Sequence, residues 1–161
     1  VIGVGSALGT TTHMAFDETG AVTKPLQPSF YVQHGNTADV TGDGTLYAIA
    51  MNAERFDTNG DCSSATFTAP VTGVYFFSMT THFTTPNAGR RSHMQIQASN
   101  RALEMYFNSN PESNNVYGNH LSGLVDMDAS DTVQFRVTIH GEGADSVDLT
   151  DYSHYQGYLV A

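Results

Sequence analysis

Short runs in which hydrophobic and polar residues alternate cover most of the chain, and clusters of Gly, Asn, Asp and Pro separate these runs. In Ser29–His34, for example, Phe30 and Val32 alternate with polar neighbours. A period of two residues is the pattern of a β-strand with one buried face. His93–Ala98 alternates in the same way, and Gly73–Thr81 is a strand candidate rich in aromatic residues. The other predicted strands are Ala65–Ala69, Leu121–Met127, Thr132–Ile139 and Tyr152–Val160.

Helix signals are nearly absent. Leu46–Arg55 and Ser99–Phe107 contain helix-forming residues, but the first lies between two Gly/Asp turn clusters, which favours a strand. Leu121–Met127 and Thr132–Ile139 are expected to pair across the turn Asp128–Asp131. Eight or more short strands in one domain predict an all-β fold, either an antiparallel β-sandwich or a jelly roll.

The composition of the chain changes near Pro25. Residues 1–25 are rich in Gly and Thr and too weakly apolar to form a core alone, although Phe16–Thr23 has the pattern of a small hairpin. Pro25 and Pro28 restrict the backbone that leads into the dense strand pattern. We therefore expect residues 1–25 to end a fibrous shaft or neck and residues 26–161 to form a head; a flexible linker is the alternative for the first segment.

Charge and cysteine content exclude several functions. The net charge is -10, from 16 acidic and 6 basic residues, so binding to nucleic acid or to an anionic membrane surface is disfavoured. No stretch of about 18 apolar residues is present, which argues against membrane insertion. Cys62 is the single cysteine, so packing or assembly has to stabilise the head in place of an internal disulfide.

A family resemblance appears at Phe67–Ser78, which reads FTAPVTGVYFFS. This segment resembles the globular head of the complement first component, subunit q, and the related tumour-necrosis-factor-like jelly rolls. The resemblance continues in LSGLVDM at 121–127, DTVQF at 131–135 and YQGYL at 155–159. It implies a homotrimeric, non-enzymatic binding domain in which apolar residues of several strands are buried between chains, with alternate residues of Gly73–Thr81 facing the core.

The front of the chain departs from the animal members of this family because it has no Gly-X-Y collagen repeat. Met14–Phe30 instead looks like the shaft-to-head passage of phage tail fibres. The two resemblances together imply the receptor-binding tip of a fibre in a virion, which recognises a host-surface glycan or protein. A trimerisation foldon of a fibrous protein and a secreted, extracellular complement-q-like lectin are the alternatives.

Catalytic and metal motifs are weak. Neither G-x-S-x-G nor H-E-x-x-H is present, so we do not expect an enzyme. Asp57–Asp61 resembles the start of a calcium loop but lacks the distal Glu, which favours a hairpin turn. In some relatives the loop before the S-G-x strand holds calcium, and the corresponding candidates are Glu112 and Asn114. No cofactor is required; calcium is possible there or in the acidic loop Glu142–Asp148, and solvated loops are the alternative.

Candidate ligand-binding residues lie in polar loops. Arg90 and Arg91 follow a Pro-Asn-Ala-Gly turn and could bind a carboxylate of an acidic glycan, the alternative being solvated charges. Tyr117 lies in a Gly/Asn loop and is the preferred tyrosine for stacking on a sugar, whereas Tyr155 is assigned to the core. The remaining candidates for sugar stacking are Tyr106 and Tyr152, and the loops expected to form the binding tip are Pro86–Arg91, Ser109–Asn119 and Gly141–Asp148.

Overall fold

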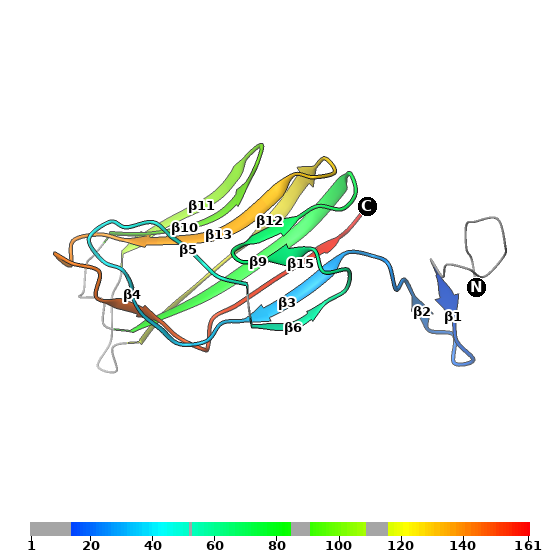
Figure 1. Cartoon of the computed structure of the whole chain (residues 1–161), viewed down its shortest axis with the longest axis horizontal. Coiled ribbons are helices and arrows are strands. Elements are labelled where there is room, and N and C mark those ends of the chain that lie inside the picture. The colour runs from blue at the N-terminus through cyan, green and yellow to red at the C-terminus, as the bar shows by residue number, and fades with distance from the viewer. Residues whose placement is uncertain (1–13, 52, 85–90, 109–115) are drawn as a thin grey trace.

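The computed structural model describes residues 14–51, 53–84, 91–108 and 116–161, and these residues form β-strands and no helix (Figure 1). The prediction of an all-β chain is therefore confirmed. No helix long and apolar enough to cross a bilayer occurs in the described residues. The strands are β1 (Ala15–Phe16), β2 (Val22–Thr23), β3 (Ser29–Gln33), β4 (Thr37–Thr41), β5 (Tyr47–Ala48), β6 (Glu54–Asp57), β7 (Cys62–Ser63), β8 (Thr66–Thr68), β9 (Gly73–Thr84), β10 (Arg91–Ala98), β11 (Ala102–Asn108), β12 (Val116–Met127), β13 (Thr132–Ile139), β14 (Val147–Leu149) and β15 (His154–Leu159).

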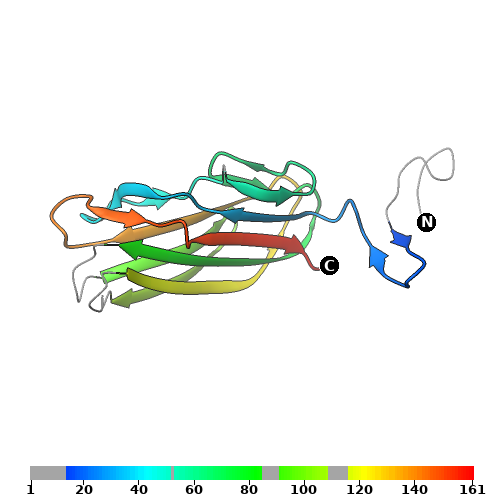
Figure 2. The same cartoon turned by 90° about the horizontal axis from the view of Figure 1, so that it is seen from below.

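The head consists of two antiparallel sheets that lie face to face. In the sheet that we call the front sheet, β6, β3, β15, β9 and β12 lie side by side, with β14 also pairing with β9 and β4 with β14 (Figure 2). The back sheet has the order β11–β10–β13–β8–β7, and β5 also pairs with β13. The chain crosses from one sheet to the other between β9 and β10 and again between β12 and β13, which gives the predicted jelly roll.

The expected pairing of Leu121–Met127 with Thr132–Ile139 is wrong. β12 pairs with β9 in the front sheet, whereas β13 pairs with β10, β8 and β5 in the back sheet. The turn between them hydrogen-bonds to Ala69, whose amide donates to Asp131 O (2.8 Å) and whose carbonyl accepts from Ser130 N (2.8 Å). The turn therefore crosses the end of the sandwich instead of closing a hairpin.

The expected hairpin at Asp57–Asp61 is also wrong, because β6 belongs to the front sheet and β7 to the back sheet. The two carboxylate oxygens of Asp57 accept from Gly60 N (3.1 Å) and Cys62 N (2.8 Å). This carboxylate thus closes a turn between the sheets. Leu46–Arg55, for which a strand was favoured over a helix, contributes β5 and the start of β6, and Ser99–Phe107 contributes most of β11.

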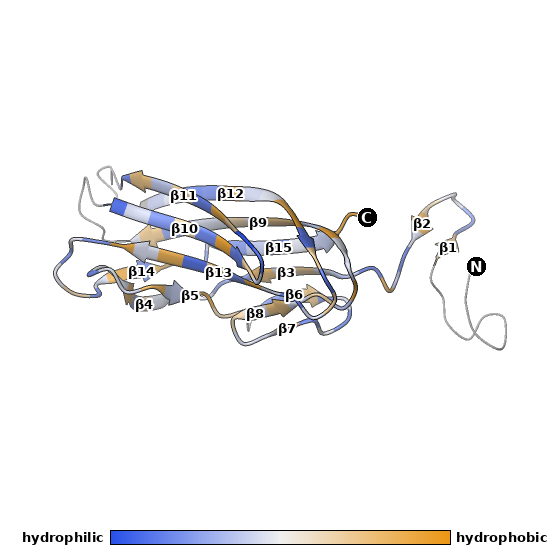
Figure 3. Ribbon diagram, turned by 90° about the horizontal axis from the view of Figure 1, so that it is seen from above, coloured by the Kyte–Doolittle hydropathy of each residue, from blue (hydrophilic) through white to orange (hydrophobic). Residues whose placement is uncertain are grey.

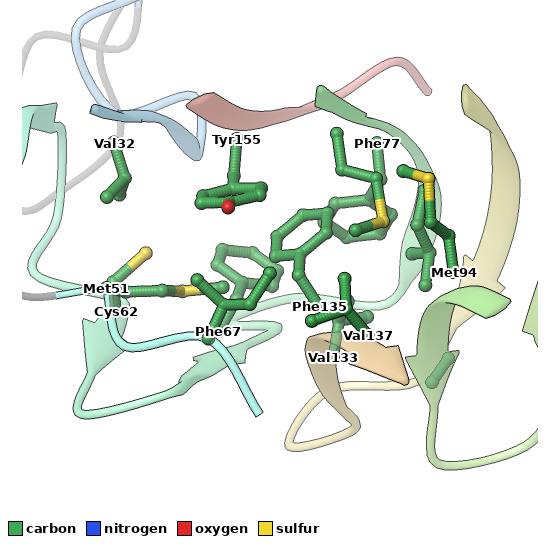
Figure 4. Close-up of a cluster of buried hydrophobic side chains, with 14 of the residues drawn as sticks. Val32, Met51, Cys62, Phe67, Phe77, Met94, Val133, Phe135, Val137 and Tyr155 are labelled. Atoms are coloured by element: carbon green, nitrogen blue, oxygen red, sulfur yellow. The ribbon is translucent and has the colours of Figure 1, made fainter. Parts of the chain in front are cut away.

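Aromatic residues of both sheets fill the core (Figure 4). Tyr75, Phe77 and Met79 of β9 are fully buried, as alternation predicted, and Tyr155 is also fully buried, which confirms its assignment to the core. Rings from the two sheets are in contact, with centroids 5.1 Å apart for Phe30 and Phe67. Hydrophobic and hydrophilic residues alternate along β10 and β13 (Figure 3). Since successive side chains of a strand point to opposite faces, the outer face of the back sheet carries the hydrophilic residues.

Gly157 lies where two of these core rings approach β15. It pairs with Phe30 on one side and with Phe77 on the other. A Cβ atom on Gly157 would lie 2.6 Å from Phe77 Cδ1 and 2.8 Å from Phe30 Cε1, closer than van der Waals contact allows. The absence of a side chain at this position is therefore a packing requirement of the core.

The neck before the head contains the predicted small hairpin. β1 pairs with β2, and the Asp17 carboxylate accepts from Thr19 N and Ala21 N (2.8 Å each) across the turn. Phe16 and Val22 face each other in this ladder, and both are exposed. The hairpin lies beyond the head at the end that also carries Ala161 (Figure 1).

Candidate functional site

The three loops expected to form the tip begin and end together at one end of the sandwich. Arg91 pairs with Asn108, and Thr84 pairs with both Val116 and Asp148. In Figure 1 this end lies opposite the neck and the C-terminus, and we call it the distal end. Arg90, Glu112 and Asn114 lie outside the described residues.

The described part of the distal end carries an aromatic platform on the outer face of the back sheet. Tyr106 on β11 is 58% exposed, and its ring stacks on His93 of β10 with centroids 4.0 Å apart and an interplanar angle of 2°. The guanidinium carbon of Arg91 lies 5.7 Å from the centroid of the Tyr106 ring. A shallow groove of about 520 Å³ is lined by Arg91, Tyr106, Phe107 and Asn108.

Polar groups continue this platform along the strands. Gln95 Nε2 donates to Glu104 Oε1 (2.7 Å), and Glu104 Oε2 lies 3.8 Å from His93 Nε2. Burial lowers the pKa of His93, with a smaller opposing contribution from the Glu104 carboxylate. His93 is therefore mainly neutral near pH 7, and Glu104 retains an oxygen that can accept a hydrogen bond.

Tyr117 occupies a different place from the platform. Its ring is half-buried and stacks on Phe107, with centroids 5.5 Å apart. Its hydroxyl donates to Asn108 O (3.3 Å). Tyr117 lies in strand β12 and not in the expected loop, and it pairs with Phe83 of β9. It closes the edge between the two sheets, and the structure does not bring it onto the face that carries Arg91 and Tyr106.

Tyr117 was preferred over Tyr106 because its surroundings are polar and rich in Gly and Asn, whereas the segment around Tyr106 is compatible with a helix or a strand. If it is taken as a strand, the alternation of Leu103, Met105 and Phe107 with Glu104 and Tyr106 places the tyrosine on the polar face. That alternation was the available signal, and the polar composition around Tyr117 outweighed it.

A second surface is the outer side of the front sheet, which we call the aromatic face. Leu124, Phe76 and Tyr158 stand side by side on β12, β9 and β15, and Leu124 is 56% exposed. Tyr31 and Phe56 stack beside them on β3 and β6, with ring centroids 6.3 Å apart. Phe56, Leu124 and Tyr158 are about half exposed, and such a patch is the usual mark of a protein interface.

Histidines cluster on the same face towards the distal end. His120 and His154 both pair with Thr80, and His120 Nδ1 lies 3.0 Å from Thr80 Oγ1. His82 lies two residues further along β9, and its imidazole would contact any Cβ atom added at Gly118. Burial, and secondarily the charge of His154, lower the pKa of His82.

The acidic residues of the distal end act as structural acceptors. The Asp148 carboxylate accepts from Asp39 N (3.0 Å) and Thr84 Oγ1 (3.1 Å), and Asp145 Oδ1 accepts from Asp43 N (3.4 Å). Within the described ranges, no group of three His, Cys, Asp or Glu side chains is arranged to hold a metal ion. Burial raises the pKa of the Cys62 thiol, which suits an unreactive core residue.

We expect the free energy of unfolding to fall as the pH is lowered from about 7.5 to about 5.5. Burial lowers the pKa values of His34, His82 and His93, so the unfolded chain binds protons more readily than the folded chain. Stability from these groups is present above their unfolded pKa of about 6.5 and is lost below it. Urea titrations at several pH values measure this change, and constant stability across the range would contradict it. A His34→Gln variant should show a shallower pH dependence, because His34 is the most buried of the three.

Comparison with known proteins agrees with this architecture. The C1q domain model matches residues 30–160. No individual curated protein sequence is significantly similar to the chain. Among solved structures, the globular domain of zebrafish complement 1qA has a TM-score of 0.60 at 15% identity and covers 84% of this chain and 98% of its own. Murine APRIL has a TM-score of 0.55 at 8% identity, and the match covers 84% of this chain and 99% of APRIL. The PRD1 vertex protein P5 has a TM-score of 0.59 at 11% identity, and the match covers 84% of this chain and 96% of P5.

The fold and its two surfaces define a jelly roll of the C1q/TNF-like class. The chain belongs to the C1q domain family, since the family model spans nearly the whole head. Domains of this class are generally non-enzymatic binding modules that form homotrimers and bind receptors, and those of the C1q family are typically extracellular or secreted.

Proposed function

We propose that the chain is a non-enzymatic, homotrimeric binding head that forms the receptor-binding tip of a phage tail fibre and recognises a host-surface glycan or protein. The observation that carries this proposal is the uncovered aromatic face of the front sheet. Burying Leu124, Phe76 and Tyr158 against two other copies would remove an exposed apolar patch from water. The distal ends of the three copies would then point the same way.

The position of the neck supports a fibre. The β1–β2 hairpin and Ala161 lie at the end opposite the distal loops, so three necks would meet where a shaft enters. A two-stranded hairpin with exposed Phe16 and Val22 is marginally stable alone and gains stability when three copies pack together. Residues 1–25 are accordingly proposed as the end of the shaft or neck, and residues 26–161 as the head.

The ligand and its location complete the proposal. Arg90, Arg91 and Tyr117 are proposed to contact the ligand, and Glu112 and Asn114 to bind calcium if it is present. The likeness to the PRD1 vertex protein P5 is compatible with a place in the virion.

A trimerisation foldon and a secreted lectin are the competing functions. A trimer carries 3 × -10 = -30 charges, so salt or bound cations should affect its assembly.

The experiment that tests this function is adsorption of the labelled 1–161 chain to a panel of bacterial strains, with sedimentation measured in parallel. The expected result is a stable trimer that binds a subset of strains and competes with phage adsorption. A trimer that binds no strain would leave the foldon as the function. A monomer at micromolar concentration would contradict the trimeric head itself.

A further inference from the structure

We propose that the platform formed by Tyr106, Arg91 and Glu104 binds a saccharide that carries a carboxylate, such as a uronic or sialic acid. The sugar ring packs on Tyr106, its carboxylate contacts Arg91, and its hydroxyl groups donate to Glu104. This inference rests on the proposed function, because it names the ligand class of the distal end.

The Tyr106 ring is held ready to receive a flat apolar surface. Its parallel stack on His93, whose side chain is only 11% exposed, fixes one face of the ring. Among the described strands, β11 is the edge of the back sheet and pairs with β10 alone. Tyr106 is 58% exposed, so part of its ring is open to solvent beside the Arg91 guanidinium. A pre-positioned aromatic ring loses little conformational freedom on binding and matches the C–H face of a pyranose.

Arg91 supplies the cation at one end of the ring. It pairs with Asn108, which lies two residues beyond Tyr106 on the same face of β11. The other described arginines have side-chain acceptors: Arg101 pairs with Asp126, and Arg55 and Arg136 donate to glutamines. Among the described residues no carboxylate lies within ion-pair distance of Arg91, and a guanidinium can bind a ligand carboxylate through two hydrogen bonds.

Glu104 supplies acceptors at the other end of the ring. It lies two residues before Tyr106, about 7 Å along the strand, and shares the outer face with it. Gln95 fixes one of its oxygens, which leaves the second for a hydroxyl group. A cation on one side of an aromatic ring and a carboxylate on the other fits an anionic sugar better than a bare anion, which Glu104 would repel. The groove of about 520 Å³ is within the size range of small-molecule sites.

The test measures equilibrium binding of the 1–161 chain to oligosaccharides of galacturonic, mannuronic and sialic acid, each paired with its neutral methyl ester. At least one acidic sugar should bind, and its ester should bind about tenfold more weakly. Tyr106→Ala and Arg91→Gln should each weaken binding of the acidic sugar about tenfold, whereas the affinity of Tyr106→Phe should stay within about twofold of the parent. Arg101→Gln is the matched control, because it removes the same charge at the opposite end of the strands.

The outcomes separate this inference from the proposed function. If no acidic sugar binds, or if inorganic sulfate competes as well as the sugar does, the platform is not a saccharide site. If the chain adsorbs to bacteria and Tyr106→Ala and Arg91→Gln adsorb equally well, the inference fails and the receptor-binding function stands. If acidic sugars bind through Tyr106 while no strain binds the chain, the site stands and the phage function fails. Thermal unfolding of each variant checks that the fold is retained.

Discussion

Replacing Leu124 with aspartate is expected to convert the trimer into monomers. Leu124 of β12 lies beside Phe76, at one edge of the aromatic face that the proposed assembly buries. Each trimer would then contain three buried carboxylates without partners, and each of these costs several kcal/mol. Association should weaken by about 100-fold or more, which sedimentation velocity at several concentrations measures directly.

The control for this substitution is Leu46→Asp. Leu46 is as exposed as Leu124 but directly precedes β5 of the back sheet, away from the aromatic face. It should leave the trimer unchanged. Leu124→Asp should still fold, because the side chain is exposed in the single chain and makes no core contact. A Leu124→Asp protein that sediments like the parent would refute the assignment of this face.

Replacing Gly157 with alanine is expected to destabilise the head by about 1–3 kcal/mol, because one added methyl group overpacks the core. The new Cβ atom would lie 2.6 Å from Phe77 Cδ1, and both Phe77 and Phe30 are buried in the core. For a domain of this size the melting temperature should fall by about 2–4 °C per kcal/mol. Calorimetry measures the change.

Gly35→Ala is the matched control for Gly157→Ala. Gly35 is exposed, and no atom lies within 4 Å of a Cβ built on it. The unfolding free energy of the Gly35→Ala protein should differ from that of the parent by less than about 0.5 kcal/mol. Equal stability of the two alanine variants would show that the core relaxes around Gly157 and would refute the packing argument.

The sequence predicted the strands better than their partners. Alternation identified β3 and β10, which bury every second side chain, and aromatic content identified β9. It could not say which sheet a strand joins, since a short turn such as Asp128–Asp131 serves equally to close a hairpin or to cross the sandwich. The strand pattern indicated the all-β class, and the choice of the jelly roll came from the resemblance at Phe67–Ser78. β4 and β14 were not predicted, because their segments are short and rich in Asp, Gly and Thr.

The candidate site was predicted only in part. Arg91 was singled out from its position after a turn, and it lies on the platform at the distal end. Tyr106 and His93 were not brought together by sequence reasoning, because their contact depends on the register of β10 with β11. The aromatic face likewise depends on which side of five strands, β3, β6, β9, β12 and β15, points away from the core. Spatial neighbours of this kind are set by topology, which a single sequence does not reveal.

The place of β15 in the front sheet affects how the chain can fold during synthesis. β15 lies between β3 and β9 and pairs with both along most of its length. It is the last of the described strands to leave the ribosome, so β3 and β9 must wait with unpaired edges until Leu159 has emerged. A chain interrupted before that residue would expose those edges and would be unable to complete the sheet whose outer side forms the aromatic face. An incomplete chain would therefore lack part of the surface that the proposed assembly buries.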